Sequence, residues 1–335
     1  MNDIITLAHG SGGKQTYNLV NDIFFKHFSN DILKKGDDSA QLLLKSQRIA
    51  FTTDSFVVSP IFFRGGNIGK LSVCGTVNDL VSGGAKPVYM SCGFIIEEGM
   101  QISDLEQIVV SMAVTARECG VQIVTGDTKV VQKGAADKIF INTSGIGIVY
   151  DGVNVSGSNA KPGDRVILSG SIGEHGCSIM LEREKLSINA NIKSDCAPLN
   201  HMIDGIYEIT KDIHVVRDAT RGGIATTLNE IANQSNVGIT LHENRIPVKS
   251  EVRGVCELLG LDPLYIANEG KMLIIAPEIH ADAIVYALKN DVLGLDSCII
   301  GEITGENGSK VILKTITGSS RILGMLSSEQ LPRIC

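Results

Sequence analysis

The sequence predicts an α/β protein built from two domains. Four observations lead to this fold class. The chain has 335 residues, enough for about two domains that each bury a core. Short apolar runs alternate with helical patterns along most of its length, and 36 glycines allow many tight connections. Apolar residues make up 43% of the chain and charged residues 20%, as in an ordinary globular protein.

Strands dominate the first half, where short apolar runs are bounded by polar residues. The expected strands cover residues 37–44, 48–56, 88–96, 121–127 and 139–149. A helix is expected from residue 67 to the glycines and proline of SGGAKP. A second is expected at 103–119, because apolar residues recur there at helical spacing. Ser103 and Glu106 are expected to form its capping box, and Gly120 its C-terminal cap.

The segment GVNVSGSNAKPGD predicts a domain boundary near residue 155. Strands and helices alternate again after it, which predicts an α/β or α+β domain. The expected strands are 165–170, 214–218, 238–243, 271–276 and a final strand region, and the expected helices are 175–186, 199–211, one from Gly222, 250–259 and 280–289. The predicted domains are therefore 1–155 and 156–325, followed by a flexible, polar tail at 326–335.

The composition excludes several classes of protein. A net charge of −7 without any basic run argues against nucleic acid or a membrane surface as the partner. The N-terminus lacks a signal-peptide pattern, and no run reaches the roughly 18 apolar residues of a membrane helix. Eight cysteines occur singly, seven of them in mostly aliphatic surroundings, which predicts buried, reduced thiols and a cytoplasmic protein. The seven histidines show no metal-binding spacing and are expected to be structural or exposed.

Aspartates stand repeatedly where strands end or turns begin. Ligands of open α/β sheets bind at strand ends, and carboxylates that meet there repel one another unless a cation lies between them. Mg²⁺ is the best candidate, because it prefers oxygen ligands and bridges to phosphates. The alternative is that each aspartate only caps a turn. These residues are Asp37, Asp38, Asp54, Asp79, Asp127 and Asp218.

Glycine clusters indicate a phosphate ligand near these aspartates. HGSGGK, SGGAKP and TRGGIA offer unobstructed backbone amides, and the last leads into a helix N-terminus. A Walker A pattern cannot be fitted, so a nucleotide–Mg²⁺ site of another kind is expected. Lys129 in GDTKVV suits charge neutralisation, and Glu269 in IANEGK suits a base. For either residue the alternative is a surface ion pair.

The chain ends on Cys335, in the sequence LSSEQLPRIC. A thiol at a terminus packs against little and is open to reagents. A tail of about ten residues reaches roughly 33 Å when fully extended, so this thiol could visit a site far from its attachment point. The alternative is that a cysteine ends the chain by chance.

These motifs together resemble those of a known family. DDSA, TTDS, NDLVSGGAKP, GDTKVV, KPGDRVILSGSIGEHG, RDATRGG, LLGLDPLYIANEGK and PRIC are similar to the hydrogenase maturation factor HypE, from about residue 9 to residue 335. HypE shares a superfamily with aminoimidazole ribonucleotide (AIR) synthetase, selenophosphate synthetase and thiamine monophosphate kinase. The combination of PRIC with DPLYIANEGK is specific to HypE. Val81 and Ser82 depart from the Ala usual after the Asn-Asp pair.

The resemblance implies an AIR synthetase-like fold and a homodimer whose N-terminal sheets pair, with ATP bound near that interface. It implies that the carbamoyltransferase HypF loads a carbamoyl group onto Cys335. ATP-dependent dehydration, which yields ADP and phosphate, would then form a thiocyanate. This cyanide would pass to the iron of NiFe hydrogenase through a scaffold complex of HypC and HypD.

The implied residue roles follow the matching motifs. Cys335 carries the group, Glu269 takes a proton, and Lys129 orients the phosphates or the reacting oxygen, although the roles of Lys129 and Glu269 could be exchanged. The implied Mg²⁺ ligands are Asp37, Asp54, Asp79 and Asp218. The implied ATP contacts are Gly12, Gly13, Lys14, Asp38, Asn78 and Asp127.

Two other hypotheses stay open at this point. Another ATP enzyme of the superfamily, such as selenophosphate synthetase, would need a reactive Cys or selenocysteine near its N-terminus, whereas this chain has Ser11 and Gly12 there and its first cysteine is Cys74. A non-catalytic thiol carrier would only accept and pass on a group at Cys335. The set of aspartates argues against a carrier, and a test of ATP dependence separates the two.

Overall fold

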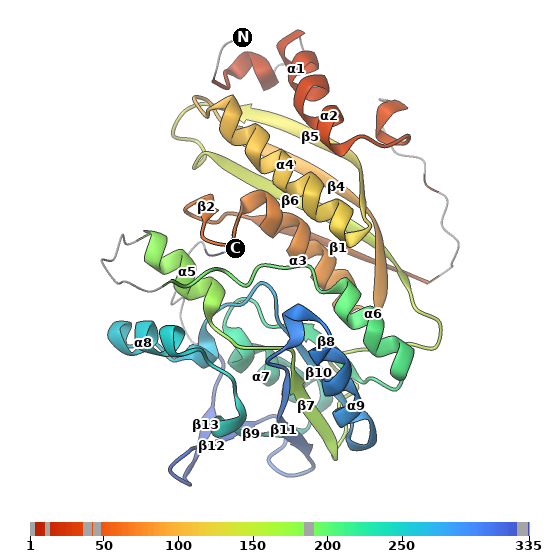
Figure 1. Cartoon of the computed structure of the whole chain (residues 1–335), viewed down its shortest axis with the longest axis vertical. Coiled ribbons are helices and arrows are strands. Elements are labelled where there is room, and N and C mark those ends of the chain that lie inside the picture. Colours follow the sequence, from red (N-terminus) through yellow and green to blue (C-terminus); the bar gives the residue numbers. More distant parts are fainter. Residues whose placement is uncertain are drawn as a thin grey trace.

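Two sheets, one above the other along the long axis of the molecule, form its framework (Figure 1). The structure is a computed structural model that describes residues 4–10, 14–35, 42, 48–183, 191–326 and 334. The strand expected at 37–44 lies outside these residues except for Leu42, which belongs to no strand.

The first sheet has four strands in the order β1-β6-β4-β5. Neighbouring strands are antiparallel, except that β4 and β5 run parallel. The four expected strands after residue 48 are confirmed, and β4 begins three residues earlier than expected. The strands are Ile49–Phe56 (β1), Ala85–Glu97 (β4), Gln122–Val131 (β5) and Ile139–Val149 (β6).

Helices α3 (Ile68–Ser82) and α4 (Ile102–Cys119) cover one face of this sheet (Figure 1). They cross closely, because a Cβ at Gly69 would clash with the carbonyl oxygen of Ile108. Twelve of the 15 residues of α3 are buried, since the second half of the chain packs against its other side. Helix α3 therefore lies at the junction of the two halves.

The other face of the sheet, which we call the open face, stays exposed. It carries Ile49 and Phe51 on β1, with exposed fractions of 47% and 67%, and Ile95 on β4 with 45%. Strand register aligns Asp127 with Gly93 and Lys129 with Ile95, so both β5 residues lie on this open face as well. Exposed apolar side chains of this size on a sheet face indicate an interaction surface.

The ends of α4 test the capping prediction. Gly120 caps the C-terminus in the left-handed region at φ 70°, as expected. The prediction of a capping box formed by Ser103 and Glu106 was wrong, because the helix begins at Ile102 and its N-cap residue is Gln101. The Glu106 carboxylate instead contacts Lys26 at 2.9 Å and His27 at 3.1 Å. A tertiary contact has replaced the local cap.

Several short elements were not expected from the sequence. A helical segment at 14–28 packs beside β5, and its Phe24 ring stacks on Phe94 with centroids 4.9 Å apart. These short elements are α1 (Lys14–Leu19), a π-helical turn (Val20–Phe25), α2 (Lys26–Phe28), the hairpin β2 (Phe62–Phe63) and β3 (Gly66–Asn67), and 3₁₀ turns at Leu7–Gly10, Leu33–Lys35, Glu243–Arg245, Pro263–Tyr265 and Val292–Gly294.

The second sheet has seven strands in the order β13-β12-β9-β11-β7-β10-β8. Only β12 and β9 are parallel among these described strand pairs. The strands are Asp164–Leu168 (β7), Val215–Asp218 (β8), Gly238–His242 (β9), Met272–Pro277 (β10), Cys298–Thr304 (β11), Val311–Lys314 (β12) and Ser320–Leu323 (β13).

Helices cover both faces of the second sheet. Ile274 of β10 shares a hydrophobic cluster with residues of α6 and α9, and Ile275 shares another with residues of α7. The expected alternation of strands and helices is therefore confirmed. The helices are Glu174–Arg183 (α5), Asn200–Ile209 (α6), Gly223–Ser235 (α7), Ser250–Leu259 (α8) and Glu278–Lys289 (α9).

The connection between the sheets runs from β6 to β7. The domain boundary predicted near residue 155 falls in this connection and stays a prediction. Of the seven described cysteines, all free thiols, six are buried as expected and Cys298 is partly exposed. None of the helices that the structure describes has the length and apolar character of a membrane span.

Candidate active site

Three aspartates approach one another where the first sheet, α3 and the second sheet meet. This carboxylate cluster consists of Asp54 on β1, Asp79 on α3 and Asp218 at the end of β8. Asp54 faces α3, because its Oδ2 lies 3.5 Å from the Cβ position of Gly75. Asp79 accepts a hydrogen bond of 2.8 Å from Thr52 Oγ1. Residues far apart in the sequence thus place three acidic groups at one junction.

Burial and mutual repulsion perturb these carboxyl groups. Burial, followed by the charge of Asp218 and with a smaller effect of Asp54, raises the pKa of Asp79 from 3.8 to about 7. Burial also raises the pKa of Asp54 and of Asp218, although Arg221 opposes the rise at Asp54 and Arg217 opposes it at Asp218. The cluster therefore carries acidic charge that the nearby arginines compensate only in part.

The carboxylate cluster is not by itself a closed metal site. No three His, Cys, Asp or Glu side chains in the described ranges are close enough together to hold a metal ion. Mg²⁺ commonly keeps several waters and uses one or two protein carboxylates together with substrate phosphates. The donor set fits such an open arrangement, because its oxygens repel one another and a cation would relieve that repulsion.

Glu269 lies in the loop before β10 and is buried, with an exposed fraction of 3%. Burial raises the pKa of its carboxyl well above the usual value, and the nearby Cys196 and Asp218 add to the rise. Its Oε1 has no hydrogen-bond partner within the described parts of the chain. A buried carboxyl oxygen without a partner is costly, so this side chain is a candidate to contact a bound substrate.

The backbone around Glu269 is held by a buried ion pair. Asp195 accepts hydrogen bonds from the amides of Glu269 at 3.1 Å and Gly270 at 3.2 Å. The same carboxylate lies 3.2 Å from Lys271 Nζ, and the charge of Lys271 helps to lower the pKa of Asp195 against the effect of burial. Neither residue was predicted to belong to the site: Asp195 lies in no motif, and Lys271 ends the motif IANEGK without a role being assigned to it.

Asn78, an implied ATP contact, is buried and bonded to protein groups. Its Nδ2 donates to the carbonyl oxygens of Ala197 at 3.1 Å and Glu269 at 3.4 Å, and its Oδ1 accepts from the Leu199 amide at 2.9 Å. Its exposed fraction is 2%. The amide thus links α3 to the loops of the second half, and a role in ATP binding stays a prediction.

Asp127 and Lys129 lie elsewhere in the single chain. Both are on the open face with exposed fractions of 70% and 66%, and they form an ion pair of 3.4 Å with each other. Strands β1 and β5 are the two edges of the four-stranded sheet, three strand spacings or about 14 Å apart. One chain therefore does not bring Lys129 to Asp54 or Glu269.

Five implied site residues fall outside the described residues: Gly12, Gly13, Asp37, Asp38 and Cys335. Lys14 begins α1, and its side chain is likewise not described. Beside Cys335, however, Ile334 is described and is only 4% exposed, and its carbonyl oxygen lies 2.7 Å from His175 Nε2. No sequence pattern predicts this contact, because 159 residues separate the partners.

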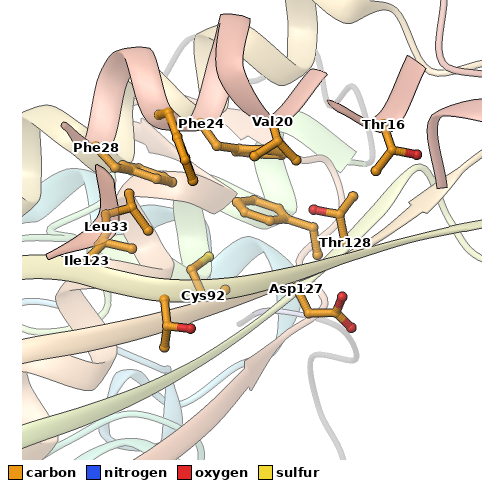
Figure 2. Close-up of a pocket in the computed structure, with 13 residues that line it drawn as sticks. Thr16, Val20, Phe24, Phe28, Leu33, Cys92, Ile123, Asp127 and Thr128 are labelled. Atoms are coloured by element: carbon orange, nitrogen blue, oxygen red, sulfur yellow. The ribbon is translucent and has the colours of Figure 1, made fainter. Parts of the chain in front are cut away.

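An apolar cavity of about 180 Å³ lies between the N-terminal helical segment and strands β4 and β5. Figure 2 shows Phe24 and Phe28 on the helical side, Cys92 and Ile123 on the sheet side, and Asp127 at the edge. Asp127 is the one charged residue among the described residues that line it. A triphosphate needs cations or amide donors, so this cavity does not suit the phosphates of a nucleotide.

Comparison with known proteins matches both halves of the chain. Residues 36–149 match the family model "AIR synthase related protein, N-terminal domain", and residues 161–314 match the corresponding C-terminal domain. The chain is 47% identical to the carbamoyl dehydratase HypE of Cupriavidus necator over 332 residues, which cover 99% of this chain and 95% of that protein.

Solved structures give the same result. A crystal structure of the hydrogenase maturation protein HypE in complex with ATP superimposes with a TM-score of 0.95 at 48% identity, covering 98% of this chain and 99% of the other. A HypE chain from a HypE–HypF complex superimposes with a TM-score of 0.82 at 48% identity, covering 92% of this chain and 99% of the other. The predicted α/β fold with two AIR synthetase-type halves is therefore confirmed.

Proposed function

The chain belongs to the HypE family of carbamoyl dehydratases, within the AIR synthase related proteins, and from this premise we propose that it dehydrates a carbamoyl group carried on its own C-terminal thiol. ATP drives the reaction, and the product is a cyano group destined for the iron of NiFe hydrogenase. The observation that carries the proposal is Glu269, a buried carboxyl near the carboxylate cluster whose Oε1 has no hydrogen-bond partner among the described residues. The dehydratase name and the ATP complex of its relatives support the same activity.

The proposed chemistry needs an activated oxygen and a proton acceptor. The thiocarbamate, Cys335–S–C(=O)–NH₂, has a poor leaving group, so its oxygen takes the terminal phosphoryl group of ATP, with loss of one N–H proton and release of ADP. Removal of the second N–H proton then lets the C≡N bond form while phosphate leaves. The net result is Cys335–S–C≡N, and the elements of water end up in the phosphate and the released protons.

Residues of this chain would divide that work. The Glu269 carboxylate accepts an N–H proton, and its buried position excludes competing water. Hydrogen bonds from Glu269 and Gly270 amides to Asp195 fix the loop in place. A base with a raised pKa holds a proton better than an exposed carboxylate. Glu269 would then hand this proton to solvent or to the departing phosphate.

Magnesium belongs to the proposal: Asp37, Asp54, Asp79 and Asp218 are its predicted ligands, of which one or two would bind an ion together with ATP phosphates and water. Bound there, Mg²⁺ would supply positive charge that neutralises the aspartates and the phosphates. The described aspartates would orient the triphosphate through the cation, which both the carboxylates and the phosphates would bind. The hydrogen bond from Thr52 Oγ1 fixes the orientation of the Asp79 carboxylate.

A homodimer belongs to the proposal as well, because it would complete the site. Asp127 and Lys129 lie on the open face, and one chain does not bring them to Glu269. Pairing of two open faces would bury Phe51, Ile49 and Ile95, which are 45% to 67% exposed. Lys129 of one chain could then serve the phosphates held by the other.

The proposed partners follow from the same family. A relative has been crystallised as a HypE–HypF complex, so we assign HypF as the carbamoyl donor. A HypC–HypD complex is the proposed acceptor of the cyano group, and the cytoplasm is the proposed location. The predicted contacts of Gly12, Gly13, Lys14 and Asp38 with ATP remain part of the proposal, whereas the Asn78 amide, which is already bonded to protein groups, is expected to contribute little to the affinity for ATP.

Intact-mass analysis tests the proposed reaction. HypF and carbamoyl phosphate are first used to attach the carbamoyl group to the protein, and all nucleotide is then removed. With MgATP, the carbamoylated species should become lighter by one water, whereas an ATP analogue that cannot transfer its terminal phosphate should leave it unchanged. Cys335→Ala should gain no mass at all. A carbamoyl group that persists with MgATP would reduce Cys335 to a carrier site, and loading of Cys335→Ala would place the group on another residue.

A further inference from the structure

The C-terminal tail is anchored inside the chain immediately before its last residue. Ile334 is 4% exposed and belongs to the hydrophobic cluster that contains Phe63 and Cys196. Its carbonyl oxygen lies 2.7 Å from Nε2 of His175 in the first turn of α5. An apolar side chain and a backbone hydrogen bond thus fix the same residue.

His175 is itself held by its neighbours. The ring is fully buried and meets Phe63 edge to face, with centroids 5.6 Å apart and an interplanar angle of 89°. Its Nδ1 lies 2.8 Å from Ser194 Oγ, which also accepts from the Cys196 amide at 3.0 Å. The ring can neither rotate nor shift without breaking these contacts, so Nε2 points at the tail in a preset direction.

The proton positions follow from the partners. A carbonyl oxygen only accepts, so Nε2 must carry the hydrogen that bonds Ile334. Burial lowers the pKa of His175, although Asp195 opposes this, and the ring is therefore neutral near pH 7. A neutral ring has one N–H, which leaves Nδ1 to accept the Ser194 hydroxyl hydrogen. The chain of bonds runs from the Cys196 amide through Ser194 and His175 to the tail.

The loop that orients His175 also holds the candidate base. Ser194 contacts the ring, while the next residue, Asp195, accepts from the amide of Glu269. The hydrogen bonds that hold Ile334, through His175, and those that hold Glu269 therefore end on adjacent residues of one loop, Ser194 and Asp195. Consecutive Cα atoms lie about 3.8 Å apart, so an anchored Ile334 restricts the volume that the following thiol can reach relative to Glu269.

We propose that His175 is a positioning residue for the dehydration: its Nε2–H holds the Ile334 carbonyl and so presents the group on Cys335 to the site of the same chain. The inference rests on the proposed function, because it concerns the group that Cys335 carries. His175 touches neither that group nor ATP in this scheme. It acts by restricting the conformations of the docked tail, which reduces the entropic cost of bringing the carried group to the site.

Thiol labelling tests the docking without any catalysis. Iodoacetamide labelling of Cys335 is followed in the full-length protein by mass spectrometry, after digestion at Glu329 releases the hexapeptide QLPRIC. His175→Leu keeps much of the ring volume but has no donor, and it should label about five to ten times faster, as expected for loss of one buried hydrogen bond. His175→Gln retains an N–H and should restore much of the protection.

Ser178→Ala is the matched control. Ser178 is a buried residue of the same helix, and its hydroxyl donates to the Arg64 carbonyl oxygen at 3.2 Å rather than to the tail. This variant should label at the wild-type rate. Equal labelling of His175→Leu and wild type, or equal acceleration in His175→Leu and Ser178→Ala, would overturn the docking role.

A single-turnover assay tests the consequence for the reaction. At saturating MgATP, loaded His175→Leu should lose water about tenfold more slowly than wild type, with an unchanged Kd for ATP, and His175→Gln should recover most of the rate. Wild-type rates in His175→Leu would overturn the positioning role. The two failures are distinguishable: if wild type never loses water, the proposed function fails, while the labelling result still decides whether His175 docks the tail.

Discussion

Replacing Asn78 by Ala should destabilise the junction between the two halves of the chain. The side-chain amide makes three buried hydrogen bonds, to Ala197 O, Glu269 O and Leu199 N. A buried hydrogen bond contributes about 0.5–1.5 kcal/mol, and a partner left unpaired raises the loss. We therefore expect the free energy of unfolding to fall by about 3 kcal/mol. For a chain of this size, that loss should lower the Tm by roughly 4 °C.

Asn200→Ala provides a matched comparison. Asn200 is also almost completely buried, with an exposed fraction of 1%, but its amide makes one described hydrogen bond, to Cys119 O at 3.0 Å. Its loss should cost about 1 kcal/mol. Thermal unfolding of both variants, followed by circular dichroism with and without MgATP, compares the stability lost with three hydrogen bonds with the stability lost with one.

The comparison also tests whether Asn78 binds ATP. If its amide serves the protein as the hydrogen bonds indicate, the Kd for ATP, measured by calorimetry well below the Tm, should change less than about threefold. An Asn78→Ala variant as stable as Asn200→Ala, but with ATP affinity reduced more than about tenfold, would refute this reasoning. It would show that the three bonds are dispensable and that the nucleotide uses the amide.

Three further outcomes are expected. Glu269→Gln should slow dehydration by about 10²- to 10⁴-fold, because it cannot accept a proton, while intact mass still shows carbamoylation of Cys335; a wild-type rate would contradict its role as the base. Phe51→Glu, on the open face, should give monomers in analytical ultracentrifugation, whereas Val110→Glu on the exposed side of α4 should not; a dimeric Phe51→Glu would move the interface elsewhere. The buried, neutral His175 has a lowered pKa, so its stabilising effect should be complete above its unfolded pKa of about 6.5 and should be lost as pH falls below that value; the urea midpoint of His175→Gln should therefore fall less between pH 7 and pH 5 than that of wild type, and parallel curves would contradict this.

The sequence by itself determined most of the regular structure. The period of the apolar residues in 103–119 and the glycine at 120 predicted α4 and its C-terminal cap, because these signals act between residues at most four positions apart. The same holds for the run that became β10, whose burial on both faces matches its continuous apolar character. Family motifs added the site residues that no periodicity reveals.

Only the tertiary structure decided which of those residues meet. Glu106 forms no capping box, because Lys26 and His27 reach it from another element. Asp54 and Lys129 both belong to the first sheet, yet they lie at opposite edges and on opposite faces, since strand order and register set the face of every side chain. His175 contacts Ile334 across 159 positions. Such contacts depend on how whole elements pack, and a local pattern carries no information about that packing.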